Sequence, residues 1–273
     1  LFFARLLLIA STIALRFRRR RGYRIGCIRN GFNWDLDISE GIDLSIFVFG
    51  GFEKDTANAL KKLAKPGQTA IDIGANIGTH TLELARSVGP TGWVVALEPT
   101  DFAFDKLARN IALNPELASR IVLRKVALVD SEHRNLGNTY GSWNLLARAP
   151  KHPVHGGIVC STANARRMTL DDLVAEESLG TISVIKLDVD GFESFVLAGA
   201  ERTLKRDSPA IVMEVTPYAH EEYGADFRLV HSFLQNLGYR FLCERSFTPL
   251  PETYEGLVRL VPPGGGINVV AQK

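Results

Sequence analysis

Short apolar runs alternate along most of the chain with longer segments in which apolar residues recur every three or four positions. A short apolar run bounded by glycine, proline or polar residues is typical of a strand buried in a parallel sheet, whereas the wider spacing is typical of an amphipathic helix. Strands are predicted at residues 70–73, 93–97, 121–129, 182–187, 210–215, 239–243 and 267–271. Helices are predicted at residues 52–65, 79–88, 102–113, 168–173, 192–204 and 227–237. This alternation predicts an α/β fold with a doubly wound, mostly parallel sheet.

The pattern divides the chain into three regions. Residues 1–21 join an apolar stretch to a basic run. Residues 22–51 alternate apolar and polar positions, as short antiparallel strands do, and predict a β-rich lead-in to the main domain. Residues 52–273 hold the α/β pattern and are predicted to form the catalytic domain.

The first region is open to three interpretations. Its apolar part, residues 1–15, is shorter than the roughly 20 residues that span a bilayer. Its basic run, residues 16–21, follows the apolar part, whereas the charges of a signal peptide precede it. The region is a clipped membrane anchor with cytoplasmic arginines, an interfacial helix on anionic lipid, or a buried accessory helix. A cytoplasmic protein is expected, attached to the inner face of a membrane in the first two cases.

Charge and cysteine content exclude several classes of protein. The net charge is +2, and residues 1–24 carry seven arginines and no acid, so the rest of the chain has a net charge of −5. A mildly acidic domain lacks the basic surface patch that binds nucleic acid, so no nucleic-acid partner is expected. The three cysteines, Cys27, Cys160 and Cys243, are far apart and form no C-x-x-C pair. Neither a disulfide framework nor a zinc site is indicated, which fits a reducing compartment.

The most informative segment is residues 69–99, which combines a predicted strand, a glycine turn, a helix and a second strand. Gly74 and Gly78 allow a sharp turn and the close approach of a ligand, and the helix that follows has free N–H groups at its start. Glu98 ends the second strand, 24 positions after Gly74, near the spacing at which an acid reaches ribose hydroxyls. The segment therefore predicts a site for an adenosine-containing cofactor.

Two features of this turn argue against a dinucleotide. Its sequence is D-x-G-x-N-x-G, not G-x-G-x-x-G. Asp72 is expected beside the pocket, where a carboxylate repels pyrophosphate and attracts a sulfonium or ammonium group. S-adenosylmethionine is the cofactor that these features favour. A nicotinamide-dependent oxidoreductase and a non-catalytic nucleoside-binding module remain as alternatives.

Acidic residues lie at the carboxyl ends of four predicted strands, where ligands bind in open α/β sheets. They are Asp72, Glu98, Asp188 together with Asp190, and Glu214. Several carboxylates at one edge of a sheet predict a polar active cleft.

Within this set, Asp188 is the first candidate for a catalytic base. The period of two along a strand places Lys186 on the same side as Asp188, and an ammonium group keeps a neighbouring carboxylate charged. Such a carboxylate can accept the proton that a hydroxyl acceptor loses; Glu214 is the second candidate. Lys186 is either part of this machinery or a structural ion-pair partner. A magnesium-assisted reaction through Asp188, Asp190 and Glu214 is an alternative, although no clear ligand set is present and no metal site is predicted.

Four sequence motifs resemble the FkbM family of S-adenosylmethionine-dependent methyltransferases: DIGANIGTHT from residue 72, VALEP from residue 95, KLDVDGFE from residue 186 and IVMEV from residue 211. The resemblance covers roughly residues 72–239. It implies the class I methyltransferase fold, a Rossmann-like seven-stranded sheet with an antiparallel last strand. It also implies O-methylation of a hydroxyl on a sugar, a glycolipid or a secondary metabolite.

The resemblance implies site residues as well. By motif, Asp72, Gly74, Asn76 and Gly78 line the methionine and ribose side of the cofactor, and Glu98 holds the ribose. The family usually has Glu where this chain has Asp190.

The long irregular segment 131–165 is expected to recognise the acceptor, because long loops in compact domains commonly carry function. It contains His133, His152 and His155, which are expected to be solvated surface residues. The lead-in is expected either to cover the substrate as a lid or to pack against one end of the sheet.

Overall fold

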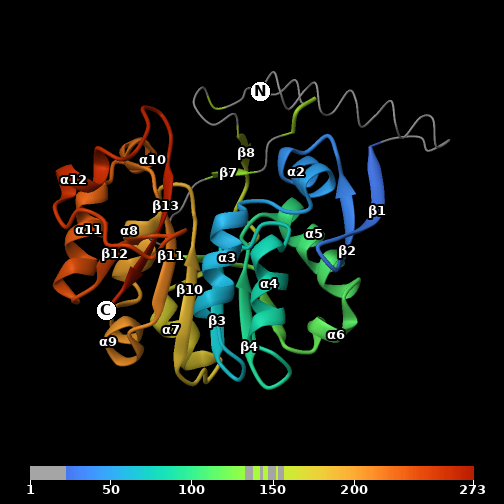
Figure 1. The fold of residues 1–273 in the computed structure, drawn as a ribbon, viewed down its shortest axis with the longest axis horizontal. Helices are drawn as coiled ribbons and strands as arrows, with labels where there is room; N and C mark the ends of the chain where they lie inside the picture. Colours follow the sequence, from blue (N-terminus) through green and yellow to red (C-terminus); the bar gives the residue numbers. More distant parts are fainter. Residues whose placement is uncertain (1–22, 133–137, 142–143, 147–151, 153–156) are drawn as a thin grey trace.

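The structure, a computed structural model, describes residues 23–132, 138–141, 144–146, 152 and 157–273. Its centre is a seven-stranded sheet in the order β12-β13-β11-β10-β3-β4-β5 (Figure 1). The strands are β3 (Thr69–Ile73), β4 (Trp93–Leu97), β5 (Ile121–Arg124), β10 (Ile182–Leu187), β11 (Ala210–Val215), β12 (Arg240–Cys243) and β13 (Ile267–Gln272). Within the part β11-β10-β3-β4-β5 of this order, all neighbouring strands are parallel. β13 is antiparallel to both β11 and β12. The predicted class I methyltransferase sheet is thereby confirmed.

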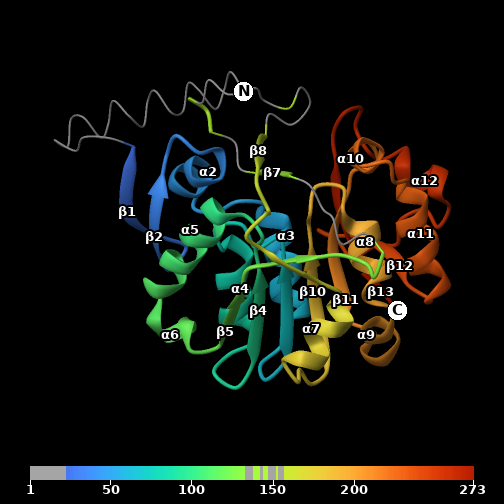
Figure 2. The ribbon, with the colours of Figure 1, turned by 180° about the vertical axis from the view of Figure 1, so that it is seen from behind.

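Helices cover both faces of this sheet, as the views from opposite sides show (Figures 1 and 2). On one face lie α3 (Lys54–Leu63), α4 (Thr79–Ser87) and α5 (Asp101–Ala112), whose apolar side chains pack against alternate positions of the strands. On the other lie α7 (Leu170–Glu176), α8 (Glu193–Ala198), α9 (Glu201–Asp207) and α11 (Phe227–Asn236).

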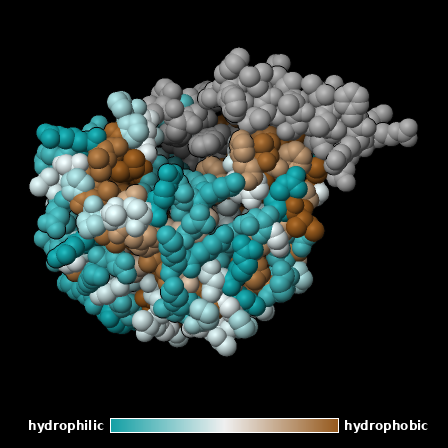
Figure 3. Space-filling view, in the orientation of Figure 1, coloured by the Kyte–Doolittle hydropathy of each residue, from teal (hydrophilic) through white to brown (hydrophobic). Residues whose placement is uncertain are grey.

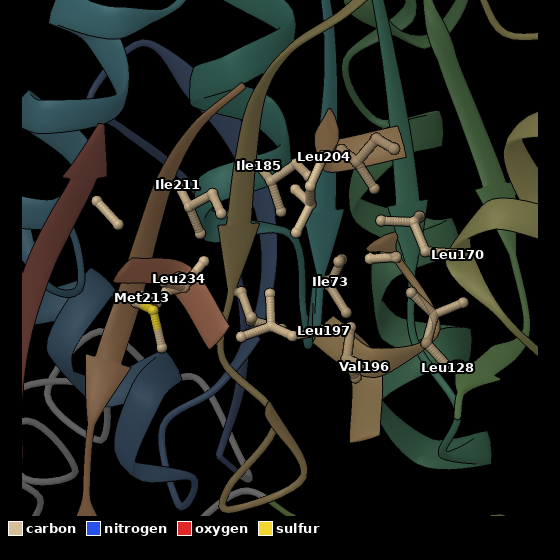
Figure 4. Close-up of a cluster of buried hydrophobic side chains, with 14 of the residues drawn as sticks. Ile73, Leu128, Leu170, Ile185, Val196, Leu197, Leu204, Ile211, Met213 and Leu234 are labelled. Atoms are coloured by element: carbon tan, nitrogen blue, oxygen red, sulfur yellow. The ribbon is translucent and has the colours of Figure 1, made fainter. Parts of the chain in front are cut away.

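Alternation along the strands divides the core between these two layers. Ile71 and Ile73 of β3 belong to the cluster under α7, α8, α9 and α11, whereas Ala70 packs with the residues of α3 and α4. Successive side chains of a strand point to opposite faces, so a strand buried on both sides is apolar throughout. Figure 4 shows the first cluster, where Ile185 and Ile211 from the sheet meet Leu204 and Leu234 from the helices.

The lead-in begins as predicted and then departs from the prediction. β1 (Arg24–Arg29) and β2 (Phe32–Asp37) form an antiparallel hairpin next to α5 (Figure 1). The apolar segment after them is not β structure but the helix α2 (Gly41–Phe49). Gly50 ends this helix in the left-handed conformation, with its N–H bonded to the carbonyl of Ile46, which is a common helix terminus.

Several element boundaries also differ from the prediction. The predicted strand 121–129 divides after β5, and β6 (Val126–Leu128) leaves the sheet to pair with β9 (Arg166–Met168). The predicted helix 192–204 divides into α8 and α9 at Gly199, where a Cβ atom would lie 2.4 Å from the carbonyl oxygen of Val129.

Other short elements lie in segments for which none was predicted. These are α6 (Pro115–Ala118), α10 (Pro217–Glu222), α12 (Tyr254–Val258), β7 (Thr139–Gly141) and β8 (Ile158–Cys160).

Among the described residues, no helix combines the length and the apolar character that crossing a membrane requires. The stretch 1–21, on which the membrane interpretations depend, lies outside the described residues. Hydrophilic residues cover most of the face shown in Figure 3, with apolar residues in separate groups between them.

Candidate active site

The carboxyl ends of the central strands surround a cavity of about 270 Å³. Its wall contains Gly74, Asn76, Glu98, Lys186, Asp188, Asp190 and Glu214, all of which were singled out in the sequence. Two further predicted site residues, Asp72 and Gly78, are not part of the wall. The cavity therefore combines the glycine turn after β3 with the acidic ends of β4, β10 and β11.

Gly74 sits where two turns of the site touch. Its φ of +75° lies in the left-handed region, and a Cβ atom here would be 1.9 Å from the carbonyl oxygen of Asp188. The amides of Gly74 and Ala75 both donate to the carbonyl oxygen of Leu97, at 3.0 and 2.9 Å. Only glycine permits this combination of backbone angle and close approach. The turn after β3 is thus fixed to the ends of both neighbouring strands.

Glu98 is buried at the end of β4, with both carboxylate oxygens engaged. One oxygen accepts from the Asn76 amide at 3.0 Å, and the other accepts from the amide and the hydroxyl of Thr100 at 2.9 and 2.6 Å. Burial raises the pKa of Glu98, although these hydrogen bonds oppose the shift. The carboxylate thus connects the glycine turn to the start of α5.

Asn76 leaves an acceptor in the wall of the cavity without a partner. Its backbone φ is +49°, and its Oδ1 atom is buried with no hydrogen-bond partner among the described residues. Buried polar atoms are normally paired, so this oxygen fits a donor on a bound molecule. This acceptor makes the turn suited to the polar part of an adenosine cofactor.

Asp72 does not face the cavity, contrary to the prediction that placed it beside the cofactor. Its carboxylate is fully buried beneath the turn, where Oδ2 accepts from the Thr81 hydroxyl at 2.6 Å. Its other oxygen lies 3.8 Å from Nζ of Lys186. Asp72 can therefore act on a ligand only through the residues above it.

Lys186 joins the two turns electrostatically. Its buried ammonium group donates to the carbonyl oxygen of Gly74 at 2.9 Å and lies 3.1 Å from Oδ2 of Asp188. Burial alone would lower the pKa of Lys186, but the attraction of Asp188, Asp72 and Glu53 outweighs it and raises the pKa. Lys186 is therefore a fixed positive charge at the floor of an acidic cavity.

The turn after β10 is held from below by Glu193. Asp190 and Gly191 both have positive φ values, +51° and +100°. The buried Glu193 carboxylate accepts from the amides of Val189 at 3.0 Å and Gly191 at 3.1 Å, and it lies 3.1 Å from Nε2 of His220. Glu193 thus shapes the turn that carries Asp188 and Asp190.

Glu214 lies at the end of β11 among like charges. Burial, with added repulsion from Asp188 and Asp190, raises the pKa of Glu214 to about 9. Desolvation and the charges of Asp188 and Glu193 likewise raise the pKa of Asp190, an exposed residue of the cavity wall. Gly266 gives Glu214 its room, since a Cβ there would lie 2.2 Å from Oε1. At neutral pH Glu214 is protonated and cannot accept a proton.

Outside the segment 131–165, three titratable residues in the wall were missed in the sequence: Glu53, His80 and Tyr218. Glu53 directly precedes α3, and His80 lies in the first turn of α4, 3.2 Å from the Glu53 carboxylate. Tyr218 lies on α10, an unpredicted helix, and burial raises its pKa to about 12. The signal in the sequence for Glu53 and His80 was their position at helix starts, which surround the binding edge of such sheets but do not reveal which of them line a site.

No group of metal-binding side chains is present within the ranges that the structure describes. Of the three loop histidines, His133 and His155 lie outside these ranges. His152 is not a solvated surface residue as expected: it is buried, and its Nε2 atom lies 2.7 Å from the Glu222 carboxylate.

Comparison with known proteins places the chain in a family. Residues 72–241 match the model of the methyltransferase FkbM domain, while comparison with curated proteins gives no significant match. Among solved structures, the methyltransferase FkbM from Methylobacillus flagellatus KT is 15% identical with a TM-score of 0.45; the match covers 79% of this chain and 50% of that one.

Two further solved structures are similar. A SAM-dependent O-methyltransferase from Thermotoga maritima is 15% identical with a TM-score of 0.44, over 85% of this chain and 70% of that one. A protein of Streptococcus mutans, assigned as a methyltransferase and solved with SAH, is 12% identical with a TM-score of 0.46, over 81% and 96%. The family match spans well over half of the chain and includes the glycine turn and the strand ends around the cavity. This chain belongs to the FkbM family and is an S-adenosylmethionine-dependent methyltransferase.

Proposed function

We propose that this enzyme transfers a methyl group to a hydroxyl oxygen of a sugar, a glycolipid or a secondary metabolite. The observation that carries the proposal is the composition of one cavity, which has a glycine turn and Glu98 on one side and several carboxyl groups on the other. The first side suits the cofactor, and the second suits an acceptor rich in hydroxyl groups, because carboxyl oxygens accept hydrogen bonds from hydroxyls.

The order of the strands gives the cofactor a direction. Glu98 at the end of β4 would bind the ribose, with the adenine toward β5 and the methionine part toward β10. The unpartnered Oδ1 of Asn76 supports a contact with a polar group of the cofactor. When bound, the cofactor supplies a methyl group on a positively charged sulfur.

Asp72 and Gly78 would support the cofactor indirectly. Asp72 stabilises the ammonium group of Lys186, which in turn bonds the carbonyl of Gly74. Gly78, with φ +98°, lets α4 begin within contact of Leu107, since a Cβ there would lie 2.7 Å from its side chain. Both residues fix the shape of the turn without touching the ligand.

Asp188 has two candidate roles, and we favour cofactor binding over catalysis. Its carboxylate is already paired with Lys186 at 3.1 Å, so a proton must compete with a fixed ammonium group for it. A carboxylate at this place can bind the cationic methionine part of the cofactor. Glu214, protonated at neutral pH, would donate a hydrogen bond to the acceptor instead of removing its proton.

The segment 131–165 supports the proposed acceptor site. Four of its described residues, Thr139, Gly141, Cys160 and Thr162, lie in the cavity wall. Since β7 and β8 hold this segment over the site, its side chains would help to select the acceptor.

Acceptors that carry phosphate are disfavoured. Among the described residues, the cavity wall includes Glu53, Glu98, Asp188, Asp190 and Glu214 but a single lysine, Lys186. Phosphate groups would meet net repulsion there, which supports a small-molecule or glycan acceptor and argues against a nucleic acid. A cytoplasmic location is part of the proposal, with membrane attachment in the two cases in which residues 1–21 form an anchor or an interfacial helix.

The test is a search for methylated products. The purified enzyme is incubated with S-adenosylmethionine that carries a CD₃ group and with extracts of bacterial glycans, lipids and small metabolites, and products are identified by mass spectrometry. The expected result is a CD₃ ether on a hydroxyl of one class. Transfer to nitrogen, to carbon or to nucleic acid would contradict the proposal, as would the absence of transfer by an enzyme that binds S-adenosylhomocysteine.

A further inference from the structure

Glu53 and His80 form a pair on the cavity wall to which no role has been assigned so far. Oε2 of Glu53 lies 3.2 Å from Nε2 of His80. The His80 side chain is 6% exposed, whereas the Glu53 side chain is 29% exposed and faces the cavity. The histidine therefore holds the carboxylate from behind, and the carboxylate is the group that a substrate can reach.

The pair lies in the half of the cavity that the cofactor leaves to the acceptor. Glu53 directly precedes α3, which packs against β10 and β11. Its carboxylate also interacts with Lys186 of β10 and with Asn268 of β13. These strands lie on the far side of β3 from β4, whose Glu98 would bind the ribose. Glu53 is thus placed near the transferring methyl group and the acceptor.

The backbone at Glu53 is held in an unusual conformation. Its φ of +44° and ψ of +63° lie in the left-handed region, although it is not a glycine. Such a residue persists only where its surroundings fix it, and such positions gather at functional sites. Here the fixed backbone directs the side chain across the cavity wall to His80.

Other carboxyl groups of the wall are poorly suited to take a proton. Glu98 already accepts three hydrogen bonds and Asp188 is paired with Lys186. Desolvation and like charges raise the pKa of both Asp190 and Glu214, which favours their protonated forms. A base must be ionised and able to reach the acceptor. Glu53 meets both conditions.

Ionisation of Glu53 follows from its neighbours. Burial would raise the pKa of Glu53, but the hydrogen bond and charge of His80, with the charge of Lys186, outweigh burial and lower it. The acidic neighbours act in the opposite direction: Asp188 on β10, Glu214 on β11 and Glu244 after β12 all interact with Glu53. The carboxylate remains charged throughout the neutral range.

We propose that Glu53 is the general base of the methyl transfer and that His80 is its positioning residue. This inference rests on the proposed O-methylation. The acceptor oxygen forms a bond to the methyl carbon as the carbon–sulfur bond of the cofactor breaks, and the electron pair of that bond stays on sulfur. The hydroxyl proton passes to the Glu53 carboxylate. The products are a methyl ether, S-adenosylhomocysteine and a protonated Glu53, which returns its proton to water.

Substitution of Glu53 tests the base. Glu53→Gln should lower kcat by about 100-fold or more, since general bases commonly contribute 10²- to 10⁴-fold, while S-adenosylhomocysteine binds within about threefold of the wild-type Kd by calorimetry. Glu53→Asp, which keeps the carboxylate, should recover part of the rate. Glu116→Gln is the control: Glu116 is an exposed glutamate of α6 and is not in the cavity wall, so its rate should stay near wild type.

The pH profile separates positioning by His80 from mere packing. His80→Leu removes the donor that lowers the pKa of Glu53, so the acidic limb of kcat/KM should move to higher pH. His80→Gln keeps a donor and should move it less. A purely structural histidine would change the rate and leave the limb in place.

The outcomes that overturn this inference differ from those that overturn O-methylation. The base assignment fails if Glu53→Gln retains a third or more of the wild-type rate, or if it loses S-adenosylhomocysteine binding, which would place Glu53 in the cofactor site. O-methylation fails if the wild-type enzyme forms no methyl ether with any extract. If His80→Leu does not fold, the two Glu53 variants still decide the assignment of the base.

Discussion

At the scale of single residues, Gly74 and Gly50 separate two effects that glycine has on a backbone. Both have φ values near +80°, but a Cβ at Gly74 would lie 1.9 Å from the Asp188 carbonyl oxygen, and a Cβ at Gly50 would meet nothing within 4 Å. Gly50→Ala should therefore cost about 1–2 kcal/mol of unfolding free energy, the strain of the left-handed conformation alone.

Gly74→Ala should cost about 2–5 kcal/mol, because overlap with the Asp188 carbonyl adds to the same strain. Urea unfolding of both variants measures the difference, and calorimetry should show that only Gly74→Ala loses S-adenosylhomocysteine binding. Equal losses of stability in the two variants would mean that the two turns do not touch.

Glu214 should make the stability of the protein depend on pH. Its pKa is raised to about 9 in the folded state, whereas an unfolded Glu titrates near pH 4.3. Between these values the folded state holds a proton that the unfolded state has lost, so the free energy of unfolding falls as the pH rises through this window.

Glu214→Gln should remove that part of the fall. The measurement is urea unfolding of both proteins at pH 5, 7 and 9, with the variant gaining stability relative to wild type as the pH increases. Parallel curves would show that Glu214 has an ordinary pKa.

At the scale of elements, one buried ion pair connects the lead-in to the main domain. Asp43 of α2 is fully buried and is paired with Lys106 of α5, and it also accepts from the Asp37 amide at 2.6 Å. Removing one member of a buried pair leaves the other charge without compensation, which commonly costs about 3–5 kcal/mol.

Lys106→Met should accordingly lower the free energy of unfolding by about 3 kcal/mol. Lys125→Met is the control. Lys125, which follows β5, pairs at 2.6 Å with Asp101, the first residue of α5. This pair lies near the surface, where such pairs contribute about 1 kcal/mol or less. If urea unfolding gave similar losses for both variants, α2 would not depend on this pair.

The strands of the main sheet could be predicted from sequence because they are buried on both faces and are therefore apolar throughout. The helix α2 could not, since its apolar and β-branched residues have the composition of a strand. Its partner Lys106 is 63 positions away in the sequence. Long-range contacts of this kind are absent from any local pattern.

The site was predictable to the same extent and for the same reason. The glycine turn, Glu98 and the acids after β10 and β11 follow strands, so the sheet brings them to one edge. Asp72 also belongs to a predicted strand, but its side chain points beneath the turn to Thr81 and Lys186. Glu53 and His80 reach the cavity from helix starts, and the sequence alone does not tell which helix starts line a site.

At the scale of the whole molecule, the cofactor should stabilise the fold because it bridges several strand ends. S-adenosylhomocysteine at a hundredfold excess over its Kd should raise the free energy of unfolding by about 2.7 kcal/mol, which raises Tm by roughly 5–10 °C in a protein of this size. NAD at the same concentration should leave Tm unchanged, because the acidic cavity repels pyrophosphate.

Two variants make this thermal-shift measurement specific. Glu98→Gln should reduce the shift, since a side-chain amide cannot accept at both of the positions that the carboxylate uses. Glu116→Gln on the exposed side of α6 should leave it intact. A shift with NAD but none with S-adenosylhomocysteine would contradict the proposed orientation of the cofactor.

The place of β13 in the sheet has a consequence for how the protein is made. This strand is the last of the seven in chain order, yet it lies between β11 and β12 and bonds to both. While the ribosome is still synthesising the segment before Ile267, β11 has an unpaired edge that another chain could join. Assembly of the sheet can therefore finish only once Gln272 has left the ribosomal exit tunnel.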